Sequence, residues 1–334
     1  MFDRIAILGA GSWGMAMAYM LDKNGKQVKL WEFNANDYRR LVTLRQRPDK
    51  LKGVILAPSI DITNDLKYAL EDVQLIILAI PSQFLRSVLV SMKKYYIART
   101  GFVSLAKGIE NSSLKRMTEI VHEELDIDIN LIAALSGPSH AEEVAQDMPT
   151  AVVVAGGNPE YLTNLQTTFS NQSFRAYQSD DIIGVELGGA LKNIIAIAAG
   201  IAAGLKMGDN TMGALITRGL AEISRLGIAM GAKAQTFAGL SGIGDLVTTC
   251  SSKHSRNRYV GEKIGQGEKL DNILNNMSMV AEGVATTRSG YVLAQKYDIE
   301  MPITNEVYEV LFNNKPPDVA VRELMERKLK AEIW

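Results

Sequence analysis

The chain has 334 residues, of which 47% are apolar and 22% charged, so it is not an intrinsically disordered protein, and its length predicts two globular domains. The 36 Lys and Arg residues nearly balance the 37 Asp and Glu residues, and a net charge of −1 gives no general attraction to nucleic acid or to an anionic membrane. One cysteine excludes an intrachain disulfide, and three scattered histidines do not suggest a metal site, so we expect a metal-free cytoplasmic protein.

The first half of the chain alternates strand-like and helix-like patterns. Strands are predicted at residues 4–8, 27–32, 75–79, 101–104, 131–135 and 151–154. Helices are predicted between them, at residues 13–24, 37–46, 83–93, 114–124 and 141–146. The run Leu75-Ile76-Ile77-Leu78 is apolar throughout, which is typical of a parallel strand covered on both faces. Residues 1–178 are therefore predicted to form an α/β domain with a doubly wound parallel sheet.

The pattern changes near residue 178, and no convincing strand is visible from residue 180 onward. Long helices are predicted at residues 182–205, 212–230, 279–296 and 304–312. A charged amphipathic helix is predicted at 319–330, after the turn Lys315-Pro316-Pro317. Residues 179–334 are therefore predicted to form a second domain that is all-helical.

Two apolar segments resemble targeting or membrane sequences. Residues 5–21 contain Ala16-Met17-Ala18, which resembles a signal-peptidase site, but three glycines and Ser12 interrupt the apolar run. Residues 194–205 are about half as long as the ~20 residues that a membrane span needs. We therefore expect no signal peptide and no integral membrane segment, and we expect residues 194–205 to lie in a buried core helix.

A glycine-rich motif, G-x-G-x-x-G, directly follows the first predicted strand and opens the first helix. Gly9 allows the tight turn, Gly11 lets the backbone approach a pyrophosphate, and Gly14 lets the helix pack closely on the strand. The free N–H groups at the start of the helix would face the phosphates. The motif predicts that the first domain is a Rossmann-type, dinucleotide-binding domain. A tight strand–helix turn without a ligand is the alternative.

Glu32 ends the second predicted strand, where an acidic side chain can bind the ribose hydroxyls of a dinucleotide. A carboxylate at this position should repel a 2′-phosphate, so it favours NAD over NADP. Arg39 and Arg40 could soften this preference, or they could simply form a solvated helix face.

Lys192 lies in the apolar helix predicted at 182–205. A lysine is costly to bury there unless it is paired or used in chemistry. Burial would lower the pKa of Lys192 towards neutrality, as acid–base catalysis requires. Gly188 and Gly189 lie one turn earlier on the same side and are expected to leave room for a ligand. The alternative is a lysine at the helix edge whose ammonium group reaches solvent.

Residues 239–245 form a glycine-rich segment that is expected to be a loop and ends in Asp245; hydroxyl residues follow, and then Ser255-Arg256-Asn257. These groups suit a small phosphate ester, which Arg256 can bind in a bidentate manner. A solvated linker between helices is the alternative. Cys250 is expected to pack in the core, because the sequence identifies no group that would activate its thiol.

Three more loops follow predicted strands, so their side chains should lie at the carboxyl edge of the sheet, where open α/β sheets bind ligands. Lys107 lies in the loop at 104–108, and residues 80–82 form a second edge loop. In the third loop, Ser139 and Glu142 form a capping-box pattern that is expected to start a helix. Ser139 can cap a helix and also contact a ligand.

Together these segments resemble the bacterial NAD(P)-dependent glycerol-3-phosphate dehydrogenases, nearly from end to end. The similar segments are GAGSWG at 9–14, AIPSQ at 79–83, SLAKGIE at 104–110, LSGPSHAEEV at 135–144, ELGGALKNIIAIAAG at 186–200, GLSGIGDLVTTC at 239–250, SRNR at 255–258, AEGVATT at 281–287 and MPITNEVYEVL at 301–311. The segments around Lys192 and Asp245 are the most specific, and the glycine motif is the least.

The resemblance implies reversible, NAD(P)H-dependent reduction of dihydroxyacetone phosphate to sn-glycerol 3-phosphate, which supplies the glycerophospholipid backbone. It implies that Lys192 donates and accepts the proton, and that Lys107 and Asp245 complete the catalytic set. The expected substrate-binding residues are Lys107, Gly137, Ser139, Lys192, Asn193, Asp245, Thr249, Ser255, Arg256 and Asn257. The expected cofactor-binding residues are Gly9, Gly11, Ser12, Trp13, Gly14, Glu32, Phe33, Lys107, Ala141, Arg256, Val280 and Glu282.

In one respect the chain departs from the family pattern. Many NADP-using members carry a small residue followed by His or Arg where this chain has Glu32-Phe33. We therefore expect NAD or NADP as the cofactor, with NAD preferred. Two other functions stay open: a dehydrogenase of the same build that acts on another hydroxy acid or sugar, and a non-catalytic regulator that senses NAD. By analogy with such dehydrogenases, the helical half is expected to form a homodimer.

Overall fold

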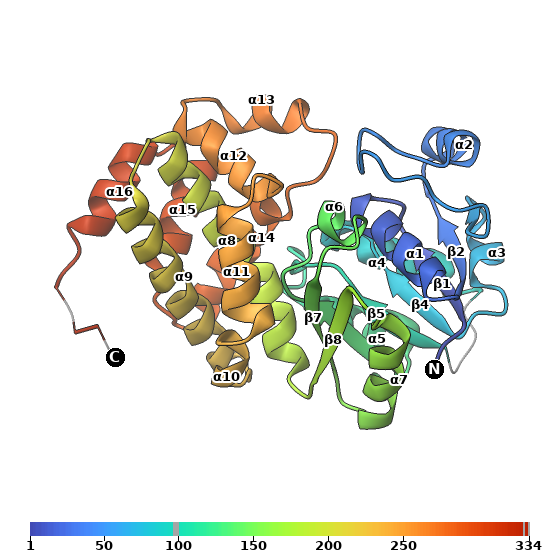
Figure 1. Cartoon of the computed structure of the whole chain (residues 1–334). Coiled ribbons are helices and arrows are strands. Elements are labelled where there is room, and N and C mark those ends of the chain that lie inside the picture. The colour runs from blue at the N-terminus through green and yellow to red at the C-terminus, as the bar shows by residue number, and fades with distance from the viewer. Residues whose placement is uncertain (96–99, 330, 333–334) are drawn as a thin grey trace.

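The fold alternates strands and helices in its first half and is helical thereafter (Figure 1). The computed structural model describes residues 1–95, 100–329 and 331–332. The first half contains β1 (Arg4–Leu8), α1 (Ser12–Lys23), β2 (Gln27–Trp31), α2 (Ala35–Leu44), β3 (Asp61–Thr63), α3 (Leu66–Leu70), β4 (Leu75–Leu78), α4 (Leu85–Met92), β5 (Gly101–Ser104), α5 (Met117–Leu125), β6 (Ile132–Ser136), α6 (Ala141–Val144), β7 (Thr150–Gly156), α7 (Pro159–Phe169) and β8 (Phe174–Ser179).

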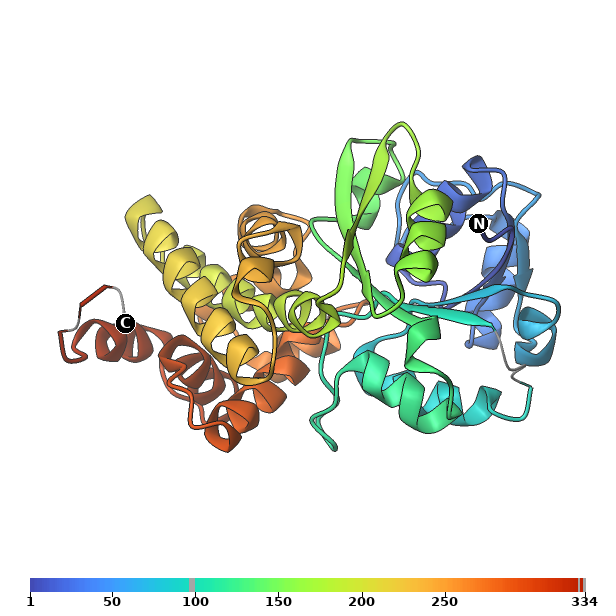
Figure 2. The same ribbon diagram turned by 90° about the horizontal axis from the view of Figure 1, so that it is seen from below.

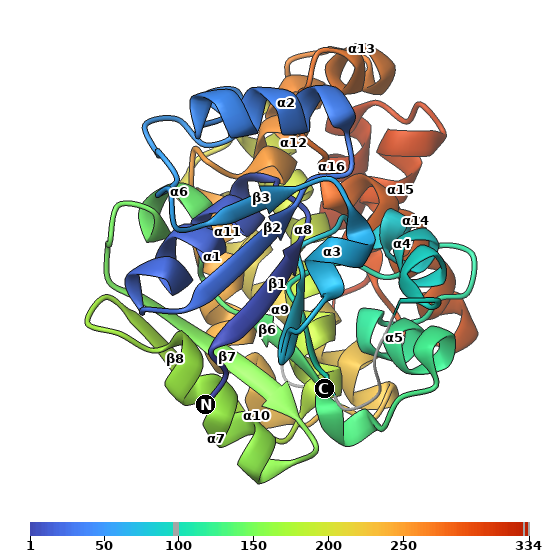
Figure 3. The same ribbon diagram turned by 90° about the vertical axis from the view of Figure 1, so that its right-hand side faces the viewer.

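The eight strands form one sheet in the order β3-β2-β1-β4-β5-β6-β7-β8 (Figure 3). All neighbouring strands from β3 to β6 are parallel. Since β1 lies between β2 and β4, the strand order reverses beside β1, which is the switch point of a doubly wound sheet. The predicted fold class is confirmed. The glycine-rich turn after β1 lies at this switch point, where open α/β sheets bind their ligands.

The central strands are apolar throughout because helices cover both faces of the sheet. In β4, Leu75 and Ile77 belong to a core shared with α1 and α7, whereas Ile76 and Leu78 belong to a core shared with α3, α4 and α5. Successive side chains of a strand point to opposite faces, so each face receives alternate residues of the same apolar run. This arrangement agrees with the sequence interpretation of residues 75–78.

The sheet is not parallel throughout. β7 pairs antiparallel with β6, and β8 then pairs parallel with β7. The chain between β6 and β7 contains only the four-residue helix α6, so it returns directly beside β6 without the long helical crossover that a parallel neighbour requires. Neither β8 nor β3 was predicted from the sequence. In β8, buried Phe174 and Ala176 alternate with exposed polar residues, a pattern that differs from the continuous apolar runs of the central strands.

The second half, from residue 182 onward, contains no strand among its described residues, as predicted. Its helices are α8 (Ile182–Gly204), α9 (Asp209–Ala229), α10 (Ala234–Phe237), α11 (Asp245–Ser251), α12 (Arg256–Gly265), α13 (Leu270–Asn275), α14 (Glu282–Lys296), α15 (Pro302–Phe312) and α16 (Pro317–Met325). The last helix is shorter than the predicted range 319–330, since α16 ends at Met325 and residues 326–329 are not helical; residue 330 lies outside the described residues. Figure 2 shows the helical half beside the sheet, with α9 along its outer side.

α8 is the central helix of this half and packs against α9, α11, α12, α14 and α15. It is long and apolar enough to cross a membrane by length and composition alone, but 89% of its most apolar window is buried inside the protein. The sequence prediction of a buried core helix at 194–205 is confirmed. Burial on all sides explains why this helix is apolar all round rather than on one stripe.

α8 and α12 pack with their backbones in direct contact. A Cβ atom added at Gly261 would lie 2.0 Å from the carbonyl oxygen of Ile197, and one added at Gly200 would lie 2.0 Å from the carbonyl oxygen of Arg258. Only glycine allows so close an approach of two helices at these positions. The start of α12 is thereby fixed relative to α8.

We expect the substitution Gly261→Ala to destabilise the protein by about 3 kcal/mol, because the added methyl group must push α12 away from α8. Urea unfolding followed by circular dichroism measures this loss. Lys263→Ala, on the same helix, is the control and should change the free energy of unfolding by less than about 0.5 kcal/mol. An equally small effect of Gly261→Ala would contradict the close-packing argument.

Candidate active site

A cavity of about 570 Å³ lies between the two halves of the molecule. Its walls come from the loops that follow β1, β4, β5 and β6, and from α8, α11, the start of α12 and residues 278–282. The residues predicted from sequence that line it are Gly9, Gly11, Ser12, Trp13, Glu32, Phe33, Lys107, Ser139, Ala141, Lys192, Asn193, Asp245, Thr249, Ser255, Arg256, Asn257, Val280 and Glu282. Gly14 and Gly137 lie behind this wall.

The glycine-rich turn has the geometry that a dinucleotide needs. Gly9 has a φ of +109°, and a Cβ atom there would lie 2.5 Å from the carbonyl oxygen of Ala79. A Cβ atom at Gly14 would lie 1.9 Å from the carbonyl oxygen of Gly9, so this glycine allows α1 to pack on the turn. Gly11 caps α1, and no atom lies within 4 Å of its Cβ position. The open space at a helix N-terminus fits a pyrophosphate.

Lys192 forms the centre of a buried charge cluster. Its Nζ lies 2.8 Å from Oδ1 of Asp245 and donates a hydrogen bond to Oγ1 of Thr249. Lys107 Nζ lies 2.8 Å from the other oxygen of the same carboxylate, Oδ2, and also donates to the carbonyl oxygen of Gly137. One carboxylate therefore holds two ammonium groups, and the cluster carries a net positive charge. Lys192 is 5% exposed, so its ammonium group does not reach bulk solvent as the alternative interpretation required.

The cluster has the electrostatics of an acid–base site. Burial lowers the pKa of Lys192 to about 8, with Lys107 lowering it further and Asp245 opposing the shift. Burial opposes ionisation of Asp245, but Lys107 and Lys192 outweigh it and hold the pKa of this carboxyl below its usual value. Near neutral pH, Lys192 can both donate and accept a proton.

Arg256 is the first residue of α12 and lies on the wall of the same cavity. Burial lowers the pKa of its guanidinium group, which still remains protonated. Within the described residues it makes no hydrogen bond, and no carboxylate lies within 4 Å of it. A partly buried, unpaired guanidinium at a helix N-terminus is suited to an anionic ligand. The side chain of Ser255 caps α12 by accepting a hydrogen bond from Arg258 N at 3.1 Å.

Residues 278–282 of the helical half reach across to the sheet beside the glycine-rich turn. Ser12 Oγ donates to Met279 Sδ at 3.3 Å, and the carboxylate of Glu282 accepts hydrogen bonds from the backbone N and the hydroxyl of Ser82. Burial raises the pKa of Glu282. These contacts close one side of the cavity over the place where a dinucleotide would lie.

Glu32 lies at the β2 end of the cavity, and its Oε1 accepts a hydrogen bond from Asn34 N at 2.9 Å. Phe33 is 79% exposed and packs edge-on against Trp31. Arg39 and Arg40 are exposed and do not line the cavity, which agrees with a solvated helix face. Lys50 is the basic residue that lines this end, and no motif identified it in the sequence.

Several local expectations from the sequence are wrong. Ser139 does not cap a helix, because α6 begins at Ala141 with His140 as its N-cap, and the Ser139 hydroxyl donates to the carbonyl oxygen of Gly137. Gly188 and Gly189 do not leave room for a ligand. Cβ atoms there would lie 2.5 Å from the carbonyl oxygen of Ser241 and 2.5 Å from Oγ of Ser136, so these glycines serve packing within the protein.

The glycine-rich segment at 239–245 is also not an extended loop. Residues 240–244 form a compact turn that is kinked at Gly242, where the backbone is not helical, and that leads directly into α11; α12 begins at Arg256. Asp245 and Thr249 are thus four residues apart on one helix face, which places both beside Lys192. The structure agrees with the expectation that Cys250 packs in the core, since it is fully buried and burial raises the pKa of its thiol to about 12.

The sequence analysis did not single out two histidines that line the cavity. The rings of His140 and His254 face each other with centroids 5.9 Å apart, one from each half of the molecule. Burial, together with Lys192 and Lys107, lowers the pKa of His140 to about 4, so its ring is neutral at pH 7. No group of three or more metal-binding side chains occurs in the part of the chain that the structure describes.

Comparisons with known proteins agree with this arrangement. Residues 4–162 match the family model of the NAD-dependent glycerol-3-phosphate dehydrogenase N-terminus, and residues 181–322 match that of the C-terminus. The chain is 48% identical over 330 residues to a glycerol-3-phosphate dehydrogenase (NAD(P)+) from Fusobacterium nucleatum, covering 99% of this chain and 98% of the relative. It is also 48% identical to the enzyme of that name from Geobacter sulfurreducens, with full coverage of both chains.

A solved structure shows the same fold. The glycerol-3-phosphate dehydrogenase from Coxiella burnetii superposes with a TM-score of 0.94 at 40% identity, covering 97% of this chain and 99% of that one.

Proposed function

Because the chain belongs to the NAD(P)-dependent glycerol-3-phosphate dehydrogenase family, we propose that it reversibly reduces dihydroxyacetone phosphate to sn-glycerol 3-phosphate. One observation carries this proposal: the Lys192–Asp245–Lys107 cluster shares a cavity with the unpaired guanidinium of Arg256. A ketone that carries a phosphate group needs both a proton donor and an anion site. The product would supply the glycerophospholipid backbone.

We propose that residues 1–178 bind the dinucleotide and that residues 179–334 supply most of the substrate site. Gly9 and Gly11 would hold the pyrophosphate at the start of α1, with Ser12 and Trp13 beside it, and Gly14 would contribute by letting α1 pack on the turn. The bound dinucleotide supplies the hydride in reduction and accepts it in oxidation. Glu32, Phe33, Ala141, Val280 and Glu282 line the same cavity and are proposed to contact it.

In reduction, Lys192 donates a proton to the carbonyl oxygen of the substrate, and in oxidation it removes the proton from the hydroxyl group. Lys107 adds positive charge beside the oxygen on which negative charge develops. Asp245 holds both ammonium groups in place. Arg256 binds the phosphate away from the reacting carbon and so fixes the orientation of the substrate, together with the start of α12 at Ser255 and Asn257.

We expect NADH to be the better cofactor. Initial rates of dihydroxyacetone phosphate reduction, measured with NADH and NADPH at equal concentrations, should favour NADH by tenfold or more, about 1.4 kcal/mol in transition-state binding. The reason is that the carboxylate of Glu32 would repel a 2′-phosphate. Faster turnover with NADPH would show that Glu32 does not face the ribose. No turnover with either cofactor, from a folded protein that binds NADH, would refute the proposed activity.

The two rival functions are tested by the same assay. A dehydrogenase for another hydroxy acid or sugar would show no dependence on the phosphate group, whereas here dihydroxyacetone phosphate should be far better reduced than dihydroxyacetone. A non-catalytic regulator would bind NADH without turnover. A regulator of this kind would not need Lys192, Asp245 and Arg256 to line one cavity.

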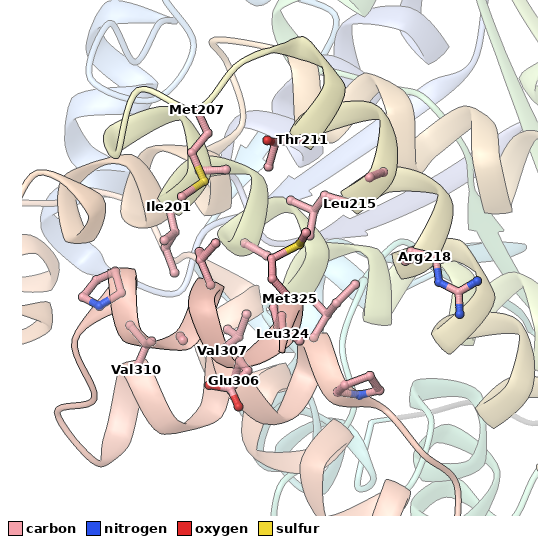
Figure 4. A pocket seen from close by; sticks show the side chains of 18 of the residues that line it. Ile201, Met207, Thr211, Leu215, Arg218, Glu306, Val307, Val310, Leu324 and Met325 are labelled. Carbon is pink, nitrogen blue, oxygen red and sulfur yellow. The ribbon is translucent and has the colours of Figure 1, made fainter. Parts of the chain in front are cut away.

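We also propose a cytoplasmic homodimer whose interface includes α9. The outer face of this helix carries the small exposed residues Gly213, Ala214 and Thr217, with the exposed side chain of Arg218 beside them. Beside it, an apolar cavity of about 250 Å³ opens between α9 and the helices α15 and α16 (Figure 4). A helix face of small residues next to an apolar hollow suits a self-complementary interface.

We expect light scattering to give twice the chain mass for the wild type, and the substitution Ala214→Arg to yield monomers, because each twofold contact would bury an unpaired charge. Arg322→Ala, on the exposed side of α16, should leave the dimer intact and serves as the control. A monomeric wild type would refute the dimer without affecting the proposed activity.

A further inference from the structure

A chain of side-chain amides connects the cofactor side of the cavity with Lys107. The backbone N of Gly283 donates to Oδ1 of Asn257 at 2.9 Å. Asn257 Nδ2 donates to Oδ1 of Asn193 at 2.9 Å, and Asn193 Nδ2 donates to the backbone carbonyl oxygen of Lys107 at 3.1 Å. Both asparagines are buried. The chain begins next to Glu282, which is bonded to Ser82, and ends in the loop after β5.

The groups at the two ends fix the direction of every hydrogen bond in this chain. A backbone N–H can only donate, so Asn257 must present its oxygen to Gly283 and its NH₂ group to Asn193. A backbone carbonyl can only accept, so Asn193 must present its NH₂ group to Lys107. Neither amide can flip without leaving a buried donor or acceptor unpaired, which costs about 1–3 kcal/mol. The side chain of Asn193 is therefore committed to the protein itself.

The last hydrogen bond in this series holds a residue of the charge cluster, Lys107. The main chain of Lys107 is held by Asn193, while its Nζ spans Asp245 Oδ2 and the carbonyl oxygen of Gly137. Lys107 and Asn193 belong to different halves of the molecule, so this bond fixes the loop after β5 against α8. A shift of this loop would withdraw the Lys107 ammonium group from Asp245, and thereby change the charge beside Lys192.

We propose that Asn193 is a positioning residue rather than a substrate ligand: its amide, oriented by Asn257 and Gly283, holds the main chain of Lys107 so that the Lys107 ammonium group stays on Asp245 beside Lys192. Of the two tests described below, only the kinetic one depends on the proposed function. The positioning role replaces the sequence-based expectation that Asn193 binds substrate. The site also depends on Gly283. A Cβ atom at this position would lie 2.7 Å from the carbonyl oxygen of Asn193.

The charges around Lys192 give this proposal a specific signature. Asp245 and Cys250 face Lys192 from α11, Lys107 faces it from the loop after β5, and His140 faces it from the start of α6. Of these groups, Lys107 is the one whose charge lowers the pKa of Lys192. If Asn193 acts through Lys107, releasing the loop should raise the pKa of Lys192, whereas a general loss of stability would not move it in a defined direction.

The kinetic test is a double-mutant cycle between Asn193 and Lys107. Asn193→Leu keeps the size and neutrality of the side chain but removes the donor, and Asn193→Ala serves as a second variant if leucine prevents folding. We expect either substitution to lower kcat/KM for dihydroxyacetone phosphate about tenfold, and to have less than about a twofold effect when Lys107 is already methionine. Equal effects with and without Lys107 would overturn the proposal.

A matched control lies on the same helix. Glu186 on α8 is buried and accepts hydrogen bonds from Thr118 N and the Thr118 hydroxyl in the sheet half, so it also links the two halves, but at a different place. Glu186→Gln should lower stability, and its kinetic effect should be the same whether or not Lys107 is methionine. This control distinguishes two effects. One is the general loss of a contact between the two halves of the molecule, and the other is the loss of the contact that positions Lys107.

A second measurement does not depend on turnover. The pH dependence of Lys192 acetylation by acetic anhydride, followed by mass spectrometry of the peptide, reports the titration of this amine in the intact protein. We expect Asn193→Leu to raise the midpoint by about half a pH unit or more, in the same direction as Lys107→Met. An unchanged midpoint in a folded variant would overturn the proposal. If the wild type lacks turnover but the midpoint shifts as stated, the proposed function fails and the positioning role stands.

Discussion

Replacing Lys192 by methionine is expected to lower kcat for dihydroxyacetone phosphate reduction about 10³-fold, because the substrate oxygen loses its proton donor. Methionine is unbranched and only one heavy atom shorter than lysine, but it carries no charge. Steady-state rates with NADH measure the loss, and a fluorescence titration with NADH checks that the variant still folds and binds the dinucleotide. Lys296→Met, an exposed lysine at the end of α14, should leave kcat unchanged. Retention of more than a tenth of the activity would exclude Lys192 as the donor.

The pH dependence of the wild type should identify the same group. Reduction requires protonated Lys192, so its rate should fall as the pH rises through about 8, the pKa that burial gives this lysine. Oxidation of sn-glycerol 3-phosphate requires the neutral amine, so its rate should rise through the same pH. If the rate of reduction falls and the rate of oxidation rises around the same pH, one acid–base group serves both reactions. Neither limb should remain in the methionine variant.

Replacing Arg256 by alanine is expected to lower kcat/KM for dihydroxyacetone phosphate by about 10²–10³-fold, since a bidentate, charge-assisted contact to the phosphate would be lost. The much slower reduction of dihydroxyacetone, which has no phosphate, should be unaffected. Added guanidinium ion should restore part of the activity of the alanine variant, because the cavity that the side chain leaves can accept it.

Arg258→Ala is the matched control for this prediction. Arg258 lies two residues further along α12 and pairs with Glu262 at 3.4 Å, outside the cavity wall. Its loss should change kcat/KM by less than about twofold. An equal effect of Arg256→Ala on both substrates would show that Arg256 supports the structure of the site and does not bind the phosphate.

The parts of this molecule that sequence could predict are those whose causes are local. The glycine turn after β1, the apolar strands and the buried helix α8 each follow from a short pattern of residues. Nearly all the residues named from motifs and from the resemblance line the candidate cavity. Most of them lie directly after a strand or at the start of a helix, and these positions can be located from the sequence. The roles of these residues stay predictions until the substitutions above are made.

The expectations that failed depend on partners far away in the chain. Gly188 meets the backbone at Ser241, and Gly189 meets Ser136, neither of which a helical pattern can indicate. The resemblance placed Lys107 and Asp245 in one site, but no local pattern could predict their direct pairing, which joins residues 138 positions apart. The reversal at β7 was not predicted, because the helix at 141–146 was interpreted as part of the strand–helix alternation of a parallel sheet, whereas α6 spans only four residues.

The glycine contact between α8 and α12 has a consequence for which substrates can react. Lys192 lies on α8 and Arg256 starts α12, and the backbones of the two helices pack in close contact at Gly200 and Gly261. The proposed proton donor and the proposed anion site therefore lie on two helices whose relative position is set by this packing. A ketone phosphate with one more carbon between its carbonyl and its phosphate would then reach Lys192 or Arg256, but not both at once. Selectivity for chain length would then reside in the helix packing itself, remote from any atom that the substrate touches.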